Sequence, residues 1–118
     1  MADIAELMQI HLMGVFGERD GARRRERIAE FYAPDLVMHD PEGAITGVEA
    51  LDAKAQELLD QAPDFVFSPA GPVEVVHDLG HLPWSFGPAG APPVVRGRDI
   101  ALVRDGRIAV AYTILLAE

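Results

Sequence analysis

The stretch from Val94 to Leu116 constrains the fold more than any other part of the sequence. Two largely apolar runs flank Asp105-Gly106, a dipeptide that is typical of the two-residue turn of a β-hairpin. The second run, Arg107 to Leu116, is apolar at both odd and even positions. Because successive side chains of a strand point to opposite faces, this strand needs cover on both sides of its sheet. The hairpin therefore predicts a sheet with a partner layer on each face.

The first half of the chain has the spacing of amphipathic helices. Apolar residues recur at i, i+3, i+4 and i+7 over residues 3–16, and residues 22–33 and 48–62 predict two more helices. Before the third helix, Thr46 and Glu49 have the spacing of a capping box. Four arginines in the second helix predict a solvated face that pairs with nearby acids: Arg23, Arg24, Arg25 and Arg27. Three helices thus precede the C-terminal strands.

The hydrophobic period changes from helix to strand after residue 63. Residues 65–67, 73–77 and 82–86 read as strands that lead into the C-terminal hairpin. Together with a first strand near residue 38, this order predicts one α+β domain over residues 1–118, with helices packed on one face of a curved, mostly antiparallel sheet. A second copy of the chain is the simplest cover for the outer face, so we expect a homodimer.

Composition narrows the class of partner. The chain has 19 Asp and Glu against 10 Lys and Arg, a formal charge of −9, which disfavours nucleic acid and anionic membrane surfaces. No apolar run reaches the roughly 20 residues that cross a bilayer, and acids occupy the start, so a cytoplasmic location is expected. The sequence has no cysteine, which excludes disulfides, thiolate metal ligands and a cysteine nucleophile.

The segment from Tyr32 to Gly47 brings a carboxylate to the end of an apolar strand. Met38 and Asp40 share one face of this strand, so Asp40 lies at the rim of any cavity that Met38 faces. A cavity role and a purely local role are equally supported here, because an aspartate at this place commonly accepts hydrogen bonds from the amides of its own turn.

Asp99 is the second candidate, since it stands in the middle of a run that is almost wholly apolar after it. Burial of a carboxylate is costly unless it is paired or keeps a proton. Exposure on an edge strand, or an ion pair with Arg96 or Arg98, is an equally weighted explanation.

The remaining polar groups add little chemistry. His11 falls on the apolar stripe of the first helix, where a core-edge role is favoured over a role in a pocket. His77 and His81 are separated by a turn, so we expect no metal site, and no glycine-rich phosphate loop or serine nucleophile motif is present. We expect no cofactor. The expected lining of a pocket for a small apolar molecule is Phe16, Met38, His77, Trp84 and Phe86.

Three segments resemble the NTF2-like superfamily, in its SnoaL-like and ketosteroid-isomerase-like branch: FYAPDLVMHDPEGAITG, WSFGPAG and GRDIALVRDGRIAVAYTILL. The resemblance covers nearly the whole chain and implies a cone-shaped, often dimeric α+β fold around an apolar cavity. It implies that Asp40 is the general base. Asp99 would then be the acid or the donor to the developing oxyanion, as in the ketosteroid isomerases. His11 is the nearest polar side chain to the position of the family's helical tyrosine, which this chain lacks.

Three functions follow as hypotheses. The first is a cofactor-independent isomerase or cyclase, in which Asp40 and Asp99 move a proton on an apolar carbonyl compound and His11 or His77 assists. The second is a non-catalytic ligand-binding or assembly module of the same fold. The third, an epoxide or lactone hydrolase, needs a polar cluster around Asp99.

Overall fold

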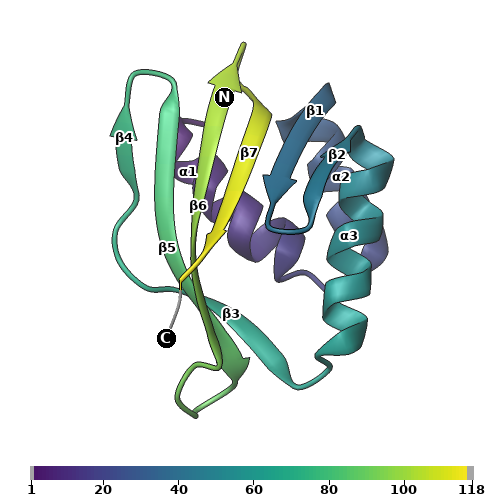
Figure 1. Cartoon of the computed structure of the whole chain (residues 1–118). Helices are drawn as coiled ribbons and strands as arrows, with labels where there is room; N and C mark the ends of the chain where they lie inside the picture. Colours follow the sequence, from purple (N-terminus) through teal and green to yellow (C-terminus); the bar gives the residue numbers. More distant parts are fainter. Residues whose placement is uncertain (1, 117–118) are drawn as a thin grey trace.

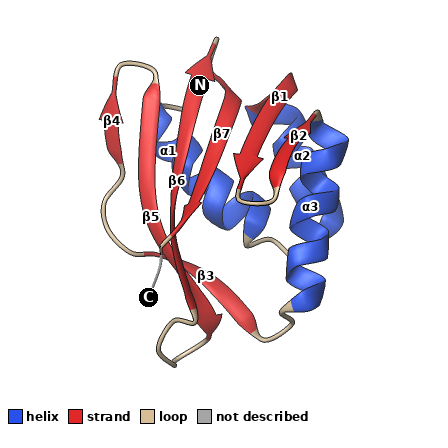
Figure 2. Cartoon of the chain, viewed as in Figure 1, coloured by secondary structure: helices blue, strands red, loops and turns tan. Residues whose placement is uncertain are grey.

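The computed structural model of the chain describes residues 2–116 and confirms an α+β architecture in which helices pack on one face of a curved sheet (Figures 1 and 2). The helices are α1 (Ile4–Gln9), which continues directly into the π-helix η1 (Ile10–Phe16), α2 (Gly21–Phe31) and α3 (Val48–Gln61). The strands are β1 (Tyr32–Asp40), β2 (Gly43–Thr46), β3 (Phe65–Pro69), β4 (Glu74–Val76), β5 (Leu79–Pro88), β6 (Val95–Arg104) and β7 (Arg107–Leu115).

The sheet has the strand order β2-β1-β7-β6-β5-β3, and β4 pairs with β5 beside this path. Among the strands of residues 2–116, β1 and β7 run parallel and the other neighbours are antiparallel. Strand β7 therefore lies between the hairpin partner that precedes it and a strand from the first half of the chain (Figure 1). This arrangement places Val37 beside Val110 and His39 beside Tyr112, although these partners are far apart in the sequence.

The first helix extends over the range that its periodicity predicts, but it changes from α to π geometry at Ile10. Its apolar stripe is buried against the sheet: Leu7, Met8, Leu12, Val15 and Phe16. His11 lies in the π segment and is only 1% exposed. Such π segments are uncommon and often occur at functional sites.

The turn between β6 and β7 is confirmed, because Asp105 and Gly106 have φ angles of 54° and 77°. The predicted capping box before α3 is wrong. Thr46 ends β2, and the helix begins after Gly47, which makes no side-chain cap. Gly47 has φ 96°, and its amide donates to the Leu36 carbonyl at 2.8 Å, so the backbone of the preceding hairpin sets the start of the helix.

The prediction of a solvated arginine face on α2 is wrong for Arg24, which is fully buried. Its guanidinium donates to Asp52 Oδ1 at 2.6 Å, to Gln56 Oε1 at 2.5 Å and to the Glu18 carbonyl at 2.7 Å. These contacts join α2 to α3. The side chain of Arg23, by contrast, is 70% exposed. Sequence spacing alone does not distinguish the buried Arg24 from the exposed Arg23, because residues of α3 supply the hydrogen-bond acceptors of Arg24.

Strand β7 does not alternate regularly. A register shift opposite Leu102 and Val103 turns Ile108 into the core, while Tyr112 and Ile114 remain 40% and 46% exposed on the outer face. The outer face therefore keeps the apolar character that the sequence indicates. Within residues 2–116, no helix has the length and apolar character that crossing a membrane requires.

Candidate functional site

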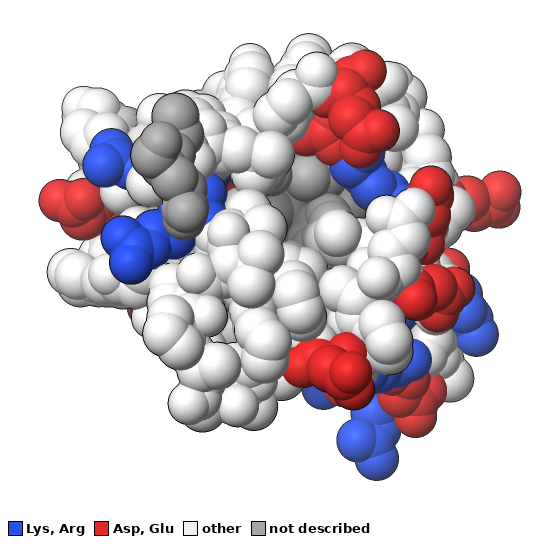
Figure 3. Space-filling view, turned by 60° about the horizontal axis from the view of Figure 1, so that its bottom comes forward, with Lys and Arg blue, Asp and Glu red and all other residues white. Residues whose placement is uncertain are grey.

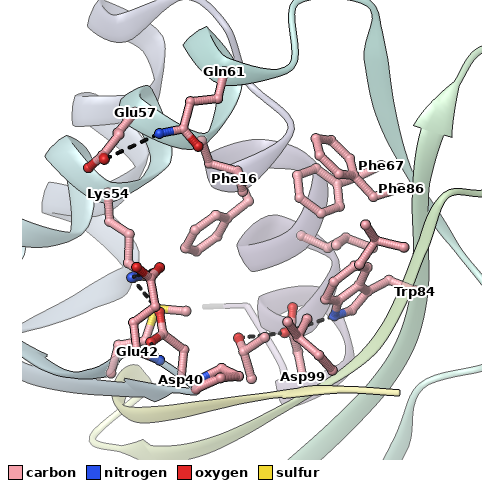
Figure 4. Close-up of a pocket in the computed structure, with 17 residues that line it drawn as sticks. Phe16, Asp40, Glu42, Lys54, Glu57, Gln61, Phe67, Trp84, Phe86 and Asp99 are labelled. Carbon is pink, nitrogen blue, oxygen red and sulfur yellow. Dashed lines mark hydrogen bonds and ion pairs between the residues drawn. The ribbon is translucent and has the colours of Figure 1, made fainter. Parts of the chain in front are cut away.

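A cavity of about 320 Å³ lies between the sheet and the helices (Figure 4). Its wall is mostly apolar, and Phe16, Phe67, Trp84 and Phe86 supply four aromatic rings. A hollow is also visible on the lower face of the molecule, where uncharged residues form most of the rim (Figure 3). The volume is at the lower end of the range for small-molecule sites.

Both candidate carboxyl groups line this cavity. On β6 and β7, Asp99 pairs with Thr113, and on β1 and β7, His39 pairs with Tyr112. Because β1 and β7 run parallel, the residues that follow this second pair, Asp40 and Thr113, also lie side by side. Asp40, Thr113 and Asp99 therefore form one row across three adjacent strands. Two strand spacings place the Cα atoms of the two aspartates on the order of 10 Å apart. A small molecule can lie between them.

Asp99 is the buried member of the row, with 4% of its surface exposed. The Trp84 indole N–H and the Thr113 hydroxyl both donate to Oδ1, at 2.9 and 3.0 Å. Burial raises the pKa of the Asp99 carboxyl, and these donors, with His11 and His81, reduce the rise without reversing it. Oδ2 accepts neither of these two bonds, which makes it the more available oxygen for a proton.

The approach of Trp84 to Asp99 depends on Gly97, which faces it across β5 and β6. A Cβ atom at residue 97 would lie 2.2 Å from Cζ2 of the indole. Only glycine leaves the ring this space. No sequence pattern connects Gly97 with the site, because the contact joins two strands.

His11 lies behind Asp99 and outside the lining of the cavity. Its Nδ1 is 2.5 Å from the hydroxyl of Tyr32. Its Nε2 has no hydrogen-bond partner among residues 2–116 and is 3.7 Å from Asp99 Oδ2. Burial lowers the pKa of His11 more than the nearby Asp99 carboxylate raises it. Burial, followed by the charge of Asp99, raises the pKa of Tyr32 well above its usual value. Both rings are therefore neutral near pH 7.

Asp40 has a different environment. Its Oδ1 accepts the amide of Glu42 at 2.8 Å, and its Oδ2 pairs with the Lys54 ammonium on α3 (Figure 4). Partial burial raises the pKa of Asp40, but Lys54 and the backbone amides of Glu42 and Gly43 outweigh it, and the net shift is downward. Asp40 thus accepts the local hydrogen bond that the sequence suggested and also lines the cavity.

The structure brings most of the expected pocket residues together. Phe16, Met38, Trp84 and Phe86 line the cavity. His77 does not: it is exposed on the turn between β4 and β5 with φ 52°, away from the site, because the strand that would have carried it ends at Val76. We therefore leave His77 out of the candidate site.

Sequence reasoning missed Lys54, Thr113 and Tyr32. Lys54 belongs to the polar face of an amphipathic helix, and such residues usually face solvent. Thr113 is one polar residue in an apolar strand, and Tyr32 falls within the predicted second helix, residues 22–33. The available signal was register: once β1 and β6 flank β7, Thr113 must lie between the two aspartates.

Comparison with known proteins gives one family. The sequence profile of the SnoaL-like domain matches residues 15–111. A proposed isomerase of the SnoaL-like family from Agrobacterium tumefaciens strain C58 has a similar structure, with a TM-score of 0.87 and 21% identity over 95% of this chain and 96% of that chain.

A proposed polyketide cyclase from Sinorhizobium meliloti has a TM-score of 0.74 and 20% identity over 94% of this chain and 95% of the other. A de novo designed protein with a curved β-sheet reaches the same TM-score at 12% identity, over 98% of this chain and 88% of that chain. No curated protein matches the sequence. Structural likeness at these identities establishes the fold.

Proposed function

The chain belongs to the SnoaL-like domain family, and we propose that it is a cofactor-independent isomerase or cyclase that moves a proton on a small, mostly apolar carbonyl compound. One observation carries the proposal: a buried carboxyl, Asp99, borders an apolar cavity, and one of its oxygens accepts no hydrogen bond from the described part of the chain. A carboxyl with a raised pKa is a better proton acceptor and donor near neutral pH than an ordinary aspartate. The descriptions of the neighbours as an isomerase and a polyketide cyclase support the same class.

The environments of the two carboxyl groups favour Asp99, rather than Asp40, as the group that first accepts the proton. Both oxygens of Asp40 are engaged, and Lys54 makes that carboxylate a weak base. We assign Asp40 the role of holding the Lys54 ammonium at the cavity. Lys54 can then polarise the carbonyl oxygen of a substrate and stabilise the negative charge that develops on it.

The reaction needs no other group. Asp99 Oδ2 takes a hydrogen, as a proton, from a carbon beside the carbonyl, and the electron pair of that C–H bond moves toward the carbonyl oxygen to form an enolate. In an isomerisation, Asp99 returns the proton to a different carbon. In a cyclisation, the enolate carbon attacks a second carbonyl of the same molecule, whose oxygen then receives the proton from Asp99.

The hydrolase hypothesis has no comparable support. It requires a polar cluster that Arg96 or Arg98 would supply to Asp99. On β6 these two arginines are exposed and alternate with buried Gly97 and Asp99, so they point to the opposite face. We do not propose hydrolysis.

The test is turnover of a panel of small ketones, including β,γ-unsaturated cyclic ketones whose conjugated products absorb in the ultraviolet. We expect Asp99→Asn to lose at least about 100-fold in kcat/KM, which is the usual contribution of general acid–base catalysis. Lys54→Met should lose activity through kcat more than through KM. Asp35→Asn, an exposed aspartate on β1, is the matched control and should keep full activity.

The same panel separates the competing assignments. Unchanged turnover in Asp99→Asn would refute the proposal, whereas an equal loss in Asp40→Asn with Asp99→Asn unaffected would make Asp40 the base. Tight binding of panel members without turnover in any form of the protein would instead support a binding module.

A further inference from the structure

The buried pair behind Asp99 has no part in the lining of the cavity. We propose that Tyr32 is a positioning residue that holds His11 in the tautomer with hydrogen on Nε2, so that His11 presents a donor, and not an acceptor, to Asp99. The inference rests on the proposed role of Asp99 in proton transfer. It is carried by three buried side chains in series, with contacts of 2.5 Å from Tyr32 to His11 and 3.7 Å from His11 to Asp99.

The donors and acceptors available to His11 and Tyr32 decide the tautomer of His11. A neutral imidazole has one N–H and one acceptor nitrogen. If His11 carried its hydrogen on Nδ1 and donated it to Tyr32, the hydroxyl hydrogen of Tyr32 would have no acceptor, since His11 is the one hydrogen-bond partner of that hydroxyl within residues 2–116. Tyr32 is only 1% exposed, and a buried hydroxyl hydrogen without an acceptor is costly. Donation from Tyr32 to Nδ1 pairs the hydroxyl hydrogen of Tyr32 with the acceptor nitrogen of His11 and leaves the hydrogen of His11 on Nε2.

The direction of the hydrogen bond from Tyr32 to His11 determines whether a proton on Asp99 can move to His11. Trp84 and Thr113 already donate to Asp99 Oδ1, so a proton taken from a substrate resides on Oδ2. With a hydrogen on Nε2, His11 cannot accept that proton. It stays on Asp99 and is available for return to the substrate, while the Nε2–H dipole stabilises the carboxylate form of Asp99 before the reaction.

Other charged groups do not replace this role. His81 on β5 contributes to the pKa of Asp99, but it pairs with Glu74 at 3.3 Å on the edge of the sheet. Asp40 and Lys54, which also line the cavity, are engaged with each other. Of these groups, only His11 is oriented toward Asp99 by a buried hydroxyl.

The test is nitrogen NMR of the histidine side chains in the folded protein, through long-range couplings between ring hydrogens and ring nitrogens. The His11 signals are identified by their loss in His11→Gln. Near pH 7 we expect a protonated Nε2 and an unprotonated Nδ1 whose shift shows an accepted hydrogen bond. In Tyr32→Phe, the Nδ1 shift should move toward that of a free acceptor nitrogen. Tyr112→Phe, at the other tyrosine of the chain, should leave it unchanged.

A hydrogen on Nδ1 in the wild-type protein would overturn the inference, and so would an unchanged Nδ1 shift in Tyr32→Phe. The wild-type spectrum decides the tautomer even if Tyr32→Phe does not fold. Because the measurement needs no substrate, its result is independent of the ketone panel: a wrong tautomer with active enzyme would reject the role of Tyr32 alone, and a correct tautomer without turnover would reject the proposed function alone.

Discussion

At the scale of single residues, one row of the sheet holds two aspartates in opposite environments. Asp99 is buried among neutral donors, and its pKa is raised, whereas Asp40 pairs with an ammonium, and its pKa is lowered. When the pKa values of two carboxyl groups are shifted in opposite directions, the two groups can have different protonation states at one pH. The chemistry of the site therefore depends more on what surrounds each carboxyl than on the presence of two.

Replacement of Asp99 by Asn should stabilise the protein at neutral and higher pH. The pKa of Asp99 is raised in the folded protein, so its favourable contribution is complete below the unfolded value near 3.8 and is lost as the pH rises through the folded value. Because asparagine does not titrate, Asp99→Asn does not lose stability in this way as the pH rises. Thermal unfolding should show a difference in Tm between variant and wild type that grows with pH from about 4 upward.

Asp35→Asn is the control, because Asp35 is an exposed side chain on β1. Its difference in Tm from the wild type should stay small across the same range. A difference for Asp99→Asn that shrinks as the pH rises would mean that the folded protein favours the charged form of Asp99, which contradicts a raised pKa.

The sequence identified both aspartates for a physical reason. Each is a carboxylate beside apolar residues, where burial has to be compensated. Lys54, Thr113 and Tyr32 carried no such signal, because each is ordinary for its own helix or strand and gains its role only from a neighbour distant in the sequence. His77 was misplaced because a positive φ angle ends its strand one residue earlier than the pattern indicated.

At the scale of elements, β5 and β6 form the wall that orients Asp99. The indole of Trp84 lies over Gly97 and reaches the carboxyl from there. The elements themselves were predictable from periodicity, and the turn at Asp105-Gly106 was predictable from two residues. The start of α3 was not, because a backbone hydrogen bond from Gly47 to Leu36, and not a side-chain cap, defines it.

We predict that Gly97→Ala displaces the indole and weakens its hydrogen bond to Asp99. Added volume in a packed wall typically costs about 1–3 kcal/mol of unfolding free energy, measurable by denaturant titration. Trp84 is the single tryptophan, so its fluorescence reports the site directly and should change in position or intensity.

Gly90→Ala provides a comparison in a surface loop, where an added Cβ contacts nothing within 4 Å, although its φ of 74° imposes a backbone cost. It should lower stability without altering the emission of Trp84. An unchanged emission spectrum in Gly97→Ala would contradict the proposed dependence of the indole on this glycine.

At the scale of the whole molecule, the helices cover one face of the sheet and leave apolar side chains on the other. Tyr112 stacks on His39 there, with ring centroids 4.8 Å apart, and Ile114 is 46% exposed. Both faces of β7 were expected to need cover from its composition alone. The expected homodimer through the outer face stays a prediction, and a second copy of the chain is the cover we propose.

Light scattering after size exclusion should give the mass of a dimer for the wild-type protein. Ile114→Lys places a charge on the outer face and should give a monomer, because an unpaired charge in an apolar interface is costly. Met13→Lys is the matched control on the helical side, with 44% exposure, and should remain a dimer. A monomeric wild type, or a dimeric Ile114→Lys, would contradict the predicted interface.

The proposed chemistry requires that the Asp99 carboxyl keeps its proton to higher pH than an ordinary aspartate. The most direct measurement is a carbon NMR titration of the side-chain carboxyl groups, in which the Asp99 signal is identified by its loss in Asp99→Asn. We expect this carboxyl to titrate above the usual value of 3.8 and the Asp40 carboxyl to titrate below it. An Asp99 carboxyl that titrates at or below 3.8 would rule out Asp99 as the buried acid–base group of the site.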